Sequence, residues 1–185
     1  HPGVNPVSLG KALVRNIRAG RIVSGGSTIS MQVVRLSRKG KPRTLYQKGI
    51  EIVLALRLEL GRNKEEIMGL YASYAPFGGN VVGIDAAAWR YYGRSSYQLS
   101  WGEAATLAVL PNAPSLIYPG RNQEELRAKR DRLLYKLEQK GVLSPLDSEL
   151  ARSEPLPSKP FPLPQLTPHL LDRAEKDGRQ GTRVH

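Results

Sequence analysis

The sequence predicts an all-α fold, and three observations support this prediction. Residues that favour helix N-caps stand before one apolar run after another, and glycine or proline follows most of these runs. Only a short piece around Val81 has the character of an extended strand. Hydrophobic residues make up 40% of the chain, but it contains only two Phe and two Trp, which indicates an aliphatic, helix-packed interior. At 185 residues, the chain suits a single domain with a core of its own.

Two helices are expected in the first part of the chain. Asn5 is a suitable N-cap with a proline directly behind it, so the first helix should cover about 6–19. Ser27 and Thr28 are well placed to cap a short second helix, which ends before a polar and basic loop at 37–42.

The third and fourth helices follow that loop. Thr44 caps the third, which should end near Leu60 with Gly61 at the stop position. This helix is apolar nearly all round, which predicts a central position in the domain. Residues 63–66, NKEE, form a capping box that opens the fourth helix, and the sequence APFGGN at 75–80 ends it.

Four further helices are expected in the second half, and a proline-rich segment follows them. The helices cover 85–92, the stretch from the capping box at 100–103 to Leu110, 122–140 and 145–153. Six of the fourteen residues at 155–168 are proline, which favours an extended linker. The sequence therefore predicts a domain over 1–154 and a linker with a short tail over 155–185, including a short helix at 168–177.

Basic residues are concentrated in the first third of the chain. Residues 1–64 contain 13 lysines and arginines against two acids, whereas residues 65–185 contain 15 against 14. A local basic region of this kind favours an anionic partner, such as nucleic acid, anionic lipid headgroups or a pyrophosphate. A solvated basic face that keeps the protein soluble is the alternative.

Several classes of protein are disfavoured by composition. The chain has no cysteine, which excludes disulfides and a cysteine-based metal site. Its histidines lie at or near the ends, at positions 1, 169 and 185, so a histidine-based zinc site is not expected. No apolar run approaches the roughly 18 residues of a membrane-spanning helix, and no signal peptide is recognisable. Because the chain begins without Met, we expect it to be a fragment of a longer protein.

Residues 24–32, SGGSTISMQ, combine a tight turn with the start of a helix. The two glycines carry no Cβ, so their backbone can come close to a ligand. A helix N-terminus presents unpaired N–H groups that often hold phosphate. Basic residues follow at 35–43, and Glu51 then stands in an otherwise apolar helix. This combination predicts an anion site; an ordinary loop-to-helix junction, with Glu51 as a structural partner of Lys48, is the alternative.

These residues and those that follow them resemble the motifs of glycosyltransferase family 51, the peptidoglycan glycosyltransferases of class A penicillin-binding proteins. Residues 25–32 resemble GGST(I/L)(T/S)xQ, and Lys48 and Glu51 match the lysine and glutamate of RKxxE. Residues 64–71, KEEIMGLY, resemble KxxILExYLN. Met31 and the sequence APFGG at 75–79 are similar to those of the penicillin-binding protein 1C subgroup.

The resemblance implies a lysozyme-like glycosyltransferase fold and a lipid-linked substrate, lipid II. The implied reaction transfers the disaccharide-peptide of the growing chain to the 4-hydroxyl of lipid II, with inversion and release of polyprenyl pyrophosphate. Residues 1–6, HPGVNP, resemble the end of the motif EDxxFxxHxGxD, whose catalytic glutamate would lie seven residues before His1. The resemblance therefore implies a fold truncated at its N-terminus and a fragment that is inactive alone.

The resemblance also assigns site residues. Glu51 would be catalytic, and with Lys48 and Arg35 it would help the pyrophosphate to depart. Lys129 and Arg130 correspond to the family's RRxxVL motif, although a solvated helix face is the alternative for them. The substrate-binding residues would be Gly26, Ser27, Thr28, Gln32, Arg35, Arg43, Lys48, Lys129 and Arg130. No metal-ligating residue is expected.

Further expectations concern cofactors, partners and location. The resemblance implies no required cofactor, and it leaves room for a divalent cation, Mg or Mn, at the pyrophosphate. Lipid II, the nascent glycan chain and the membrane surface would be partners, nucleic acid would not, and a transpeptidase domain would follow in the parent chain. The location would be the periplasmic or extracytoplasmic face of the bacterial inner membrane, with an anchoring helix outside residues 1–185.

Three residues depart from the family pattern. Gln47 replaces the first arginine of RKxxE, which removes one phosphate-binding charge, and Gly69 and Ser73 replace the usual Glu and Asn of ILExYLN. Two other functions stay open on the residues alone. One is a nucleic-acid-binding module that uses the basic face of 1–64, and the other is a lysozyme-type muramidase.

Overall fold

The computed structural model of the chain describes residues 3–19, 25–38, 44–112 and 120–162. These residues form eight α-helices and two short 3-10 helices, the latter at Ser96–Gln98 and Leu110–Asn112. The α-helices are α1 (Pro6–Ala19), α2 (Ile29–Ser37), α3 (Leu45–Gly61), α4 (Lys64–Tyr74), α5 (Ile84–Tyr92), α6 (Trp101–Val109), α7 (Gln123–Gln139) and α8 (Pro145–Ser153). The extended piece expected around Val81 is an isolated antiparallel bridge between Pro76 and Val82. The predicted all-α fold is confirmed.

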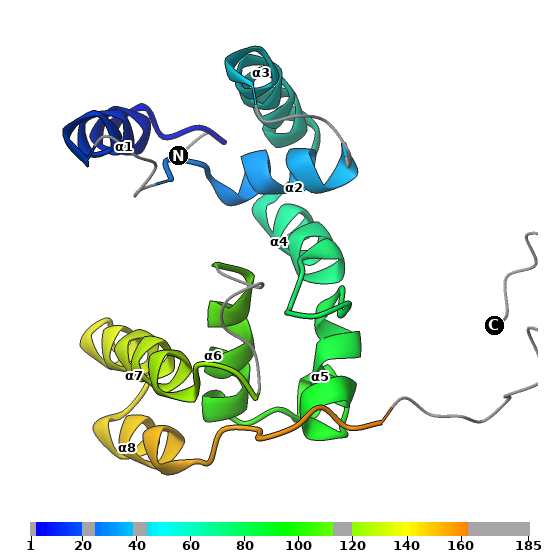
Figure 1. Cartoon of the computed structure of the whole chain (residues 1–185), viewed down its shortest axis with the longest axis vertical. Helices are drawn as coiled ribbons and strands as arrows, with labels where there is room; N and C mark the ends of the chain where they lie inside the picture. Colours follow the sequence, from blue (N-terminus) through cyan, green and yellow to red (C-terminus); the bar gives the residue numbers. More distant parts are fainter. Residues whose placement is uncertain (1–2, 20–24, 39–43, 113–119, 163–185) are drawn as a thin grey trace, which may run out of the picture.

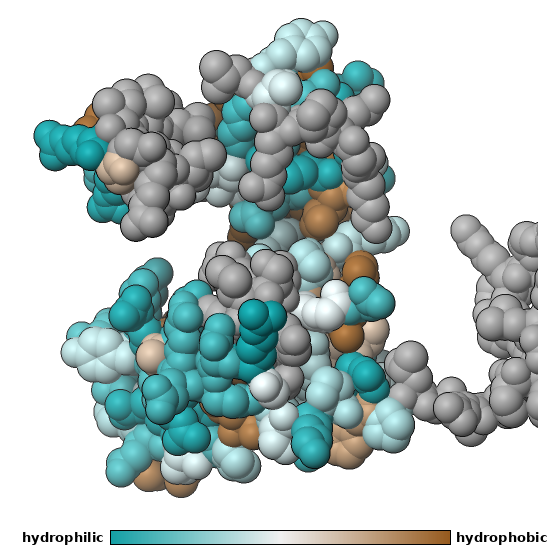
Figure 2. Space-filling model, in the orientation of Figure 1, coloured by the Kyte–Doolittle hydropathy of each residue, from teal (hydrophilic) through white to brown (hydrophobic). Residues whose placement is uncertain are grey.

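The helices form two groups that α4 and α5 connect (Figure 1). In one group, α2 packs against α3 and α4; in the other, α6, α7 and α8 pack on one another. Between the groups, α4 and α5 follow each other along one side of the molecule (Figure 1). Figure 2 shows the surface hollowed on the opposite side, between α1 and α7, and mostly hydrophilic residues over α7.

Each group has its own apolar core. Met31, Val34 and Ala55 are buried between α2 and α3. Leu134 lies in a cluster that joins α6, α7 and α8, and Leu107 lies in a larger cluster that joins α5, α6 and α7. Small and aliphatic side chains dominate these clusters, as the composition predicts.

Most helices begin at the polar residues that the sequence predicts. Thr28 and Thr44 are N-caps, and their side chains accept hydrogen bonds from backbone N–H groups one turn ahead. The capping boxes at 63–66 and 100–103 are both formed. Gly61 differs, because it is the last residue of α3 and the helix ends at the extended Arg62.

The predicted central position of α3 is wrong. One face of α3 packs against α2 and carries Ala55, which is fully buried. The opposite face is apolar and exposed, and it carries Tyr46, Val53, Leu56 and Leu60. The sequence pattern identified an apolar helix correctly, but composition alone does not show which of its faces a neighbour covers.

The first residues of the predicted linker lie against the helices. Leu156 packs on the cluster of α5, α6 and α7. The side-chain amide of Gln123 donates to the carbonyl of Pro157 at 3.1 Å, and the backbone N–H of Phe161 donates to the carbonyl of Arg90 at 2.6 Å. The predicted boundary at residue 154 therefore has packed residues on both sides. The helix expected at 168–177 lies outside the described residues.

Candidate functional site

Glu51 lies on the buried face of α3, and only 8% of its surface is exposed. Arg35, near the end of α2, reaches across to it with two hydrogen bonds. The Nε of Arg35 donates to Oε1 of Glu51 and Nη2 donates to Oε2, each at 2.8 Å. This two-pronged contact fixes both side chains, because the planar guanidinium matches the carboxylate.

Lys48 joins the same carboxylate to the glycine-rich turn. It precedes Glu51 by three residues on α3, so the two side chains share a face of the helix. Its Nζ donates to Oε2 of Glu51 at 3.2 Å and to Oγ of Ser27 at 2.5 Å. The structure thus brings together residues from two sequence motifs, and we call Ser27, Arg35, Lys48 and Glu51 the cation cluster.

The charges of the cation cluster set the protonation of Glu51. Burial raises the pKa of Glu51, but the hydrogen bonds and charges of Arg35 and Lys48 outweigh burial and hold the pKa below its ordinary value. The hydrogen bond to Glu51 raises the pKa of Arg35. Glu51 is therefore an ionised carboxylate at neutral pH and a poor proton donor. Two cations against one anion leave the cluster with a net positive charge, which suits an anionic ligand.

The turn before α2 is held from two sides. The Oγ1 of Thr28 accepts the N–H of Met31 at 3.3 Å and donates to the carbonyl of Gly3. Gly3 has a φ of +75°, and a Cβ there would come within 2.6 Å of Glu59, so only glycine fits this close approach. The Thr28 hydroxyl therefore holds the turn in place, and Gly26 beside it is partly exposed.

Gln32 lies one turn before Arg35 on α2, and its side chain contacts α4. The hydroxyl of Tyr71 donates to Oε1 of Gln32 at 3.3 Å. Burial raises the pKa of Tyr71 above its ordinary value, so its hydroxyl is a neutral donor at neutral pH.

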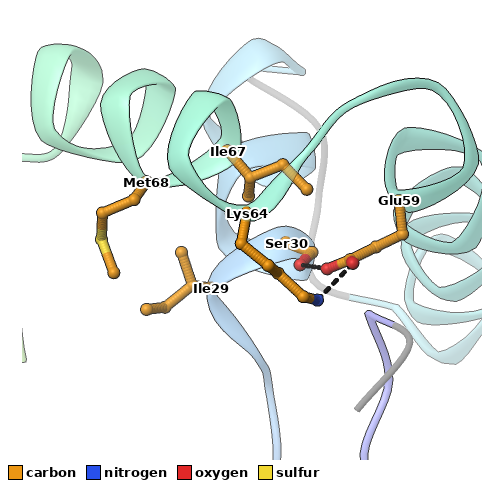
Figure 3. A pocket seen from close by; sticks show the side chains of 6 residues that line it. All are labelled: Ile29, Ser30, Glu59, Lys64, Ile67 and Met68. Carbon is orange, nitrogen blue, oxygen red and sulfur yellow. Dashed lines mark hydrogen bonds and ion pairs between the residues drawn. The ribbon is translucent and has the colours of Figure 1, made fainter.

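A pocket of about 210 Å³ lies further along α3 from the cation cluster. Eight residues separate Glu59 from Glu51, which corresponds to about 12 Å along a helix axis. The pocket is lined by Ile29, Ser30, Glu59, Lys64, Ile67 and Met68. Figure 3 shows the carboxylate of Glu59 between Ser30 and Lys64, with which it forms a hydrogen bond and an ion pair. These contacts tie α2, α3 and α4 together.

The remaining predicted site residues lie apart from the cation cluster. Arg130 is completely buried in α7 and donates to the carbonyls of Arg152 and Glu154, both at 2.7 Å, at the end of α8. Lys129 pairs with Glu125 on the surface of the same helix at 3.2 Å. The structure gives Arg130 a structural contact, and substrate binding by either residue stays a prediction. Arg43 lies outside the described residues.

The described residues do not offer a divalent cation its usual ligands. Magnesium and manganese favour several oxygen ligands. Glu51 is a single carboxylate whose two oxygens already hold Arg35 and Lys48. Across the described ranges, no group of three or more His, Cys, Asp or Glu residues is placed to hold a metal ion. A divalent cation that is held mainly by the pyrophosphate of a bound substrate stays a prediction.

Comparison with known proteins assigns the chain to a family. A family model described as "Transglycosylase" matches residues 1–138, most of the chain, and this span includes the whole cation cluster. The chain belongs to the transglycosylase family. The motif-based resemblance to the peptidoglycan glycosyltransferases of class A penicillin-binding proteins is confirmed.

Relatives of this transglycosylase chain carry matching names. Penicillin-binding protein 1C of Escherichia coli (strain K12) is 45% identical over 168 residues, which cover 91% of this chain and 22% of that protein. The biosynthetic peptidoglycan transglycosylase of Herminiimonas arsenicoxydans is 36% identical over 137 residues, which cover 74% of this chain and 59% of that protein. The chain spans about a fifth of the length of the first of these relatives, at 22%. The expected similarity to the 1C subgroup is confirmed.

A solved structure supports the transglycosylase fold. The crystal structure of penicillin-binding protein 1A from Haemophilus influenzae matches with a TM-score of 0.52 and 26% identity, over 66% of this chain and 18% of that one. In the part of the chain that the structure describes, no helix combines the length and apolar character that spanning a membrane requires.

Two features of the site were not predicted from the sequence. The contact of Tyr71 with Gln32 joins residues 39 positions apart, and that of Ser30 with Glu59 joins residues 29 apart. Tyr71 is the tyrosine of the motif that resembles KxxILExYLN, but the motif does not indicate that its hydroxyl contacts Gln32. Gln47 replaces an arginine of the family, and its buried side-chain oxygen has no hydrogen-bond partner among the described residues.

Proposed function

We propose that this chain is part of an enzyme that polymerises the glycan of peptidoglycan. It would transfer the lipid-linked disaccharide-peptide of the growing chain to the 4-hydroxyl of lipid II, with inversion at the anomeric carbon and release of polyprenyl pyrophosphate. The observation that carries this proposal is the cation cluster. Its residues come from two motifs of the transglycosylase family, and they converge on one point with a net positive charge.

The geometry of the cluster suits the departure of a pyrophosphate. As the bond from the sugar to the leaving oxygen breaks, negative charge develops on the pyrophosphate, and fixed cations stabilise it. Arg35 and Lys48 are partly exposed and retain further N–H donors beyond those that hold Glu51. Glu51, kept ionised, holds both cations in place, so its contribution is orientation and charge balance rather than proton donation.

The proposed substrate indicates where the protein works in the cell. The long polyprenyl tail of lipid II stays in a bilayer, so we expect the chain to work at a membrane surface on the extracytoplasmic face of a bacterial inner membrane. The relatives named penicillin-binding proteins are several times longer than the aligned region. A transpeptidase domain after residue 185 and an anchoring helix are therefore part of the proposal for the parent protein.

Glycan formation from labelled lipid II, followed by gel electrophoresis, tests this proposal. The parent protein that contains residues 1–185 should form a ladder of glycan chains, and its Glu51→Gln variant should lose most of that activity. An intact lipid II band would count against the polymerase. Digestion of preformed peptidoglycan would favour a muramidase, and salt-sensitive binding of RNA without lipid II turnover would favour a nucleic-acid module.

A further inference from the structure

We propose that Tyr71 is a positioning residue that orients the side-chain amide of Gln32 toward the sugar of the lipid-linked donor. This inference rests on the proposed function, because it assigns a role within the same donor site. It adds a residue of α4 to a site otherwise built from α2 and α3.

The contact joins two packed helices. The Tyr71 hydroxyl donates to Oε1 of Gln32 at 3.3 Å, and α2 packs against α4 along this region. Tyr71 is partly buried and packs on the larger core cluster, which joins α5, α6 and α7. Because this packing restricts the ring, the hydroxyl of Tyr71 has a fixed position, and its hydrogen bond restricts the side-chain amide of Gln32.

The hydrogen bond shows which edge of the amide is occupied in the structure. A glutamine amide has a carbonyl that accepts and an NH₂ group that donates. With Oε1 held by Tyr71, the NH₂ edge of Gln32 is left for an acceptor, and it has no hydrogen bond within the described ranges. Without the hydroxyl, the amide loses its contact with α4 and is free to leave this orientation.

The position of Gln32 indicates which part of the donor it meets. Gln32 and Arg35 are three residues apart on α2, so their side chains lie side by side. If Arg35 binds the pyrophosphate, its neighbours are the sugar at one end and the prenyl chain at the other, and the prenyl chain has no hydrogen-bond acceptor. Sugar hydroxyl and carbonyl oxygens accept hydrogen bonds, which matches the donating edge of Gln32.

Two probes separate sugar contact from phosphate contact. Isothermal titration measures the affinity of the chain for inorganic pyrophosphate and for a soluble lipid II analogue with a short prenyl chain. Tyr71→Phe should weaken the affinity for the lipid II analogue about 3- to 10-fold, as expected for the loss of one hydrogen bond to the sugar. The affinity for inorganic pyrophosphate should not change. Tyr74→Phe removes a hydroxyl from an exposed tyrosine of the same helix and should change neither affinity.

The partner residue supplies a second test. In a Gln32→Ala background, Tyr71→Phe should have no further effect on either probe, because its only route to the ligand has been removed. Equal weakening of both probes, or an undiminished effect without Gln32, would overturn the inference. Wild-type chain that binds pyrophosphate but not the analogue would overturn it too. Wild-type chain that binds neither probe would instead refute the proposed function on which it rests.

Discussion

Arg35 and Glu51 meet through two parallel hydrogen bonds of 2.8 Å, although 16 residues separate them in the sequence. Arg35 is in the last turn of α2 and Glu51 lies within α3, so this contact fixes the end of α2 against α3. Lys48 approaches the same carboxylate from its own helix and continues to Ser27 at 2.5 Å. The carboxylate therefore organises two positive charges beside the glycine-rich turn, and this arrangement leads to the first two predictions.

The first prediction concerns the cations. Arg35→Ala and Lys48→Ala should each weaken binding of a lipid II analogue by about 1.5–3 kcal/mol, because a charge-assisted contact to pyrophosphate is lost. The same prediction extends to Arg43, which lies outside the described residues. Isothermal titration at constant ionic strength measures the change.

Arg57→Ala is the matched control for these variants. Arg57 is an exposed cation on α3, the helix that carries Lys48. Its removal lowers the net charge by the same amount without touching the cation cluster. An equal loss of affinity in this control would mean that only bulk charge matters, and the site assignment would fail.

The second prediction concerns stability at low pH. The pKa of Glu51 and the pKa of Glu59 both lie below the ordinary value of 4.5, for Glu59 because Lys64 and Ser30 hold its charged form. Their contribution is complete above the unfolded-state pKa and is lost as pH falls through the lower folded-state values. Urea unfolding should therefore show the free energy of unfolding declining below pH 4.5.

Glutamine variants identify the source of that decline. Glu51→Gln cannot take up a proton, so its stability should depend less on pH in this range than that of the wild type. Glu65→Gln removes an exposed carboxylate of α4 and should keep the wild-type dependence. Parallel pH profiles for wild type and Glu51→Gln would show that the Arg35 contact contributes nothing to the acid sensitivity.

Local features of the fold could be predicted from the sequence because local chemistry determines them. Asn63 and Ser100 cap their helices through side-chain hydrogen bonds to residues three positions away, and Gly93 ends α5 in the left-handed conformation. The sequence pattern did not predict the role of Gly83. It precedes α5 with a φ of +90°, and a Cβ there would come within 2.8 Å of the carbonyl of Ser73.

Contacts between distant segments could not be predicted from these patterns. Motif matching placed Arg35, Lys48 and Glu51 in one site, but pattern alone did not show that Tyr71 meets Gln32. It also did not reveal the burial of Arg130, since a basic residue on a charged helix such as α7 is usually solvated. Such facts depend on how α7 and α8 pack, which helical periodicity does not encode.

The third prediction separates Arg130 from its neighbour Lys129. Arg130→Ala should lower the free energy of unfolding by about 2–5 kcal/mol, because a fully buried side chain is truncated and the carbonyls of Arg152 and Glu154 lose their donors. Lys129→Ala removes a surface pair with Glu125 and should cost at most about 1 kcal/mol. Urea denaturation of both variants measures this difference, and similar losses would contradict the structural role of Arg130.

The last prediction concerns the membrane surface that the proposed substrate requires. Helix α1 exposes Val7 and Val14, at 62% and 48%, and its exposed cations are Lys11, Arg15 and Arg18. Apolar and basic side chains together suit the surface of an anionic bilayer.

Vesicle co-sedimentation tests this surface. Binding should increase with the fraction of anionic lipid and fall as salt is added, because each basic side chain near the surface contributes about 1 kcal/mol and salt screens that attraction. Changing Lys11, Arg15 and Arg18 to Gln should weaken binding strongly. Changing the exposed Arg127, Arg132 and Lys136 of α7 to Gln removes the same charge and should weaken it less, because no exposed valines accompany those residues. Binding that ignores lipid composition, or equal losses in the two triple variants, would show that α1 is not the surface that meets the bilayer.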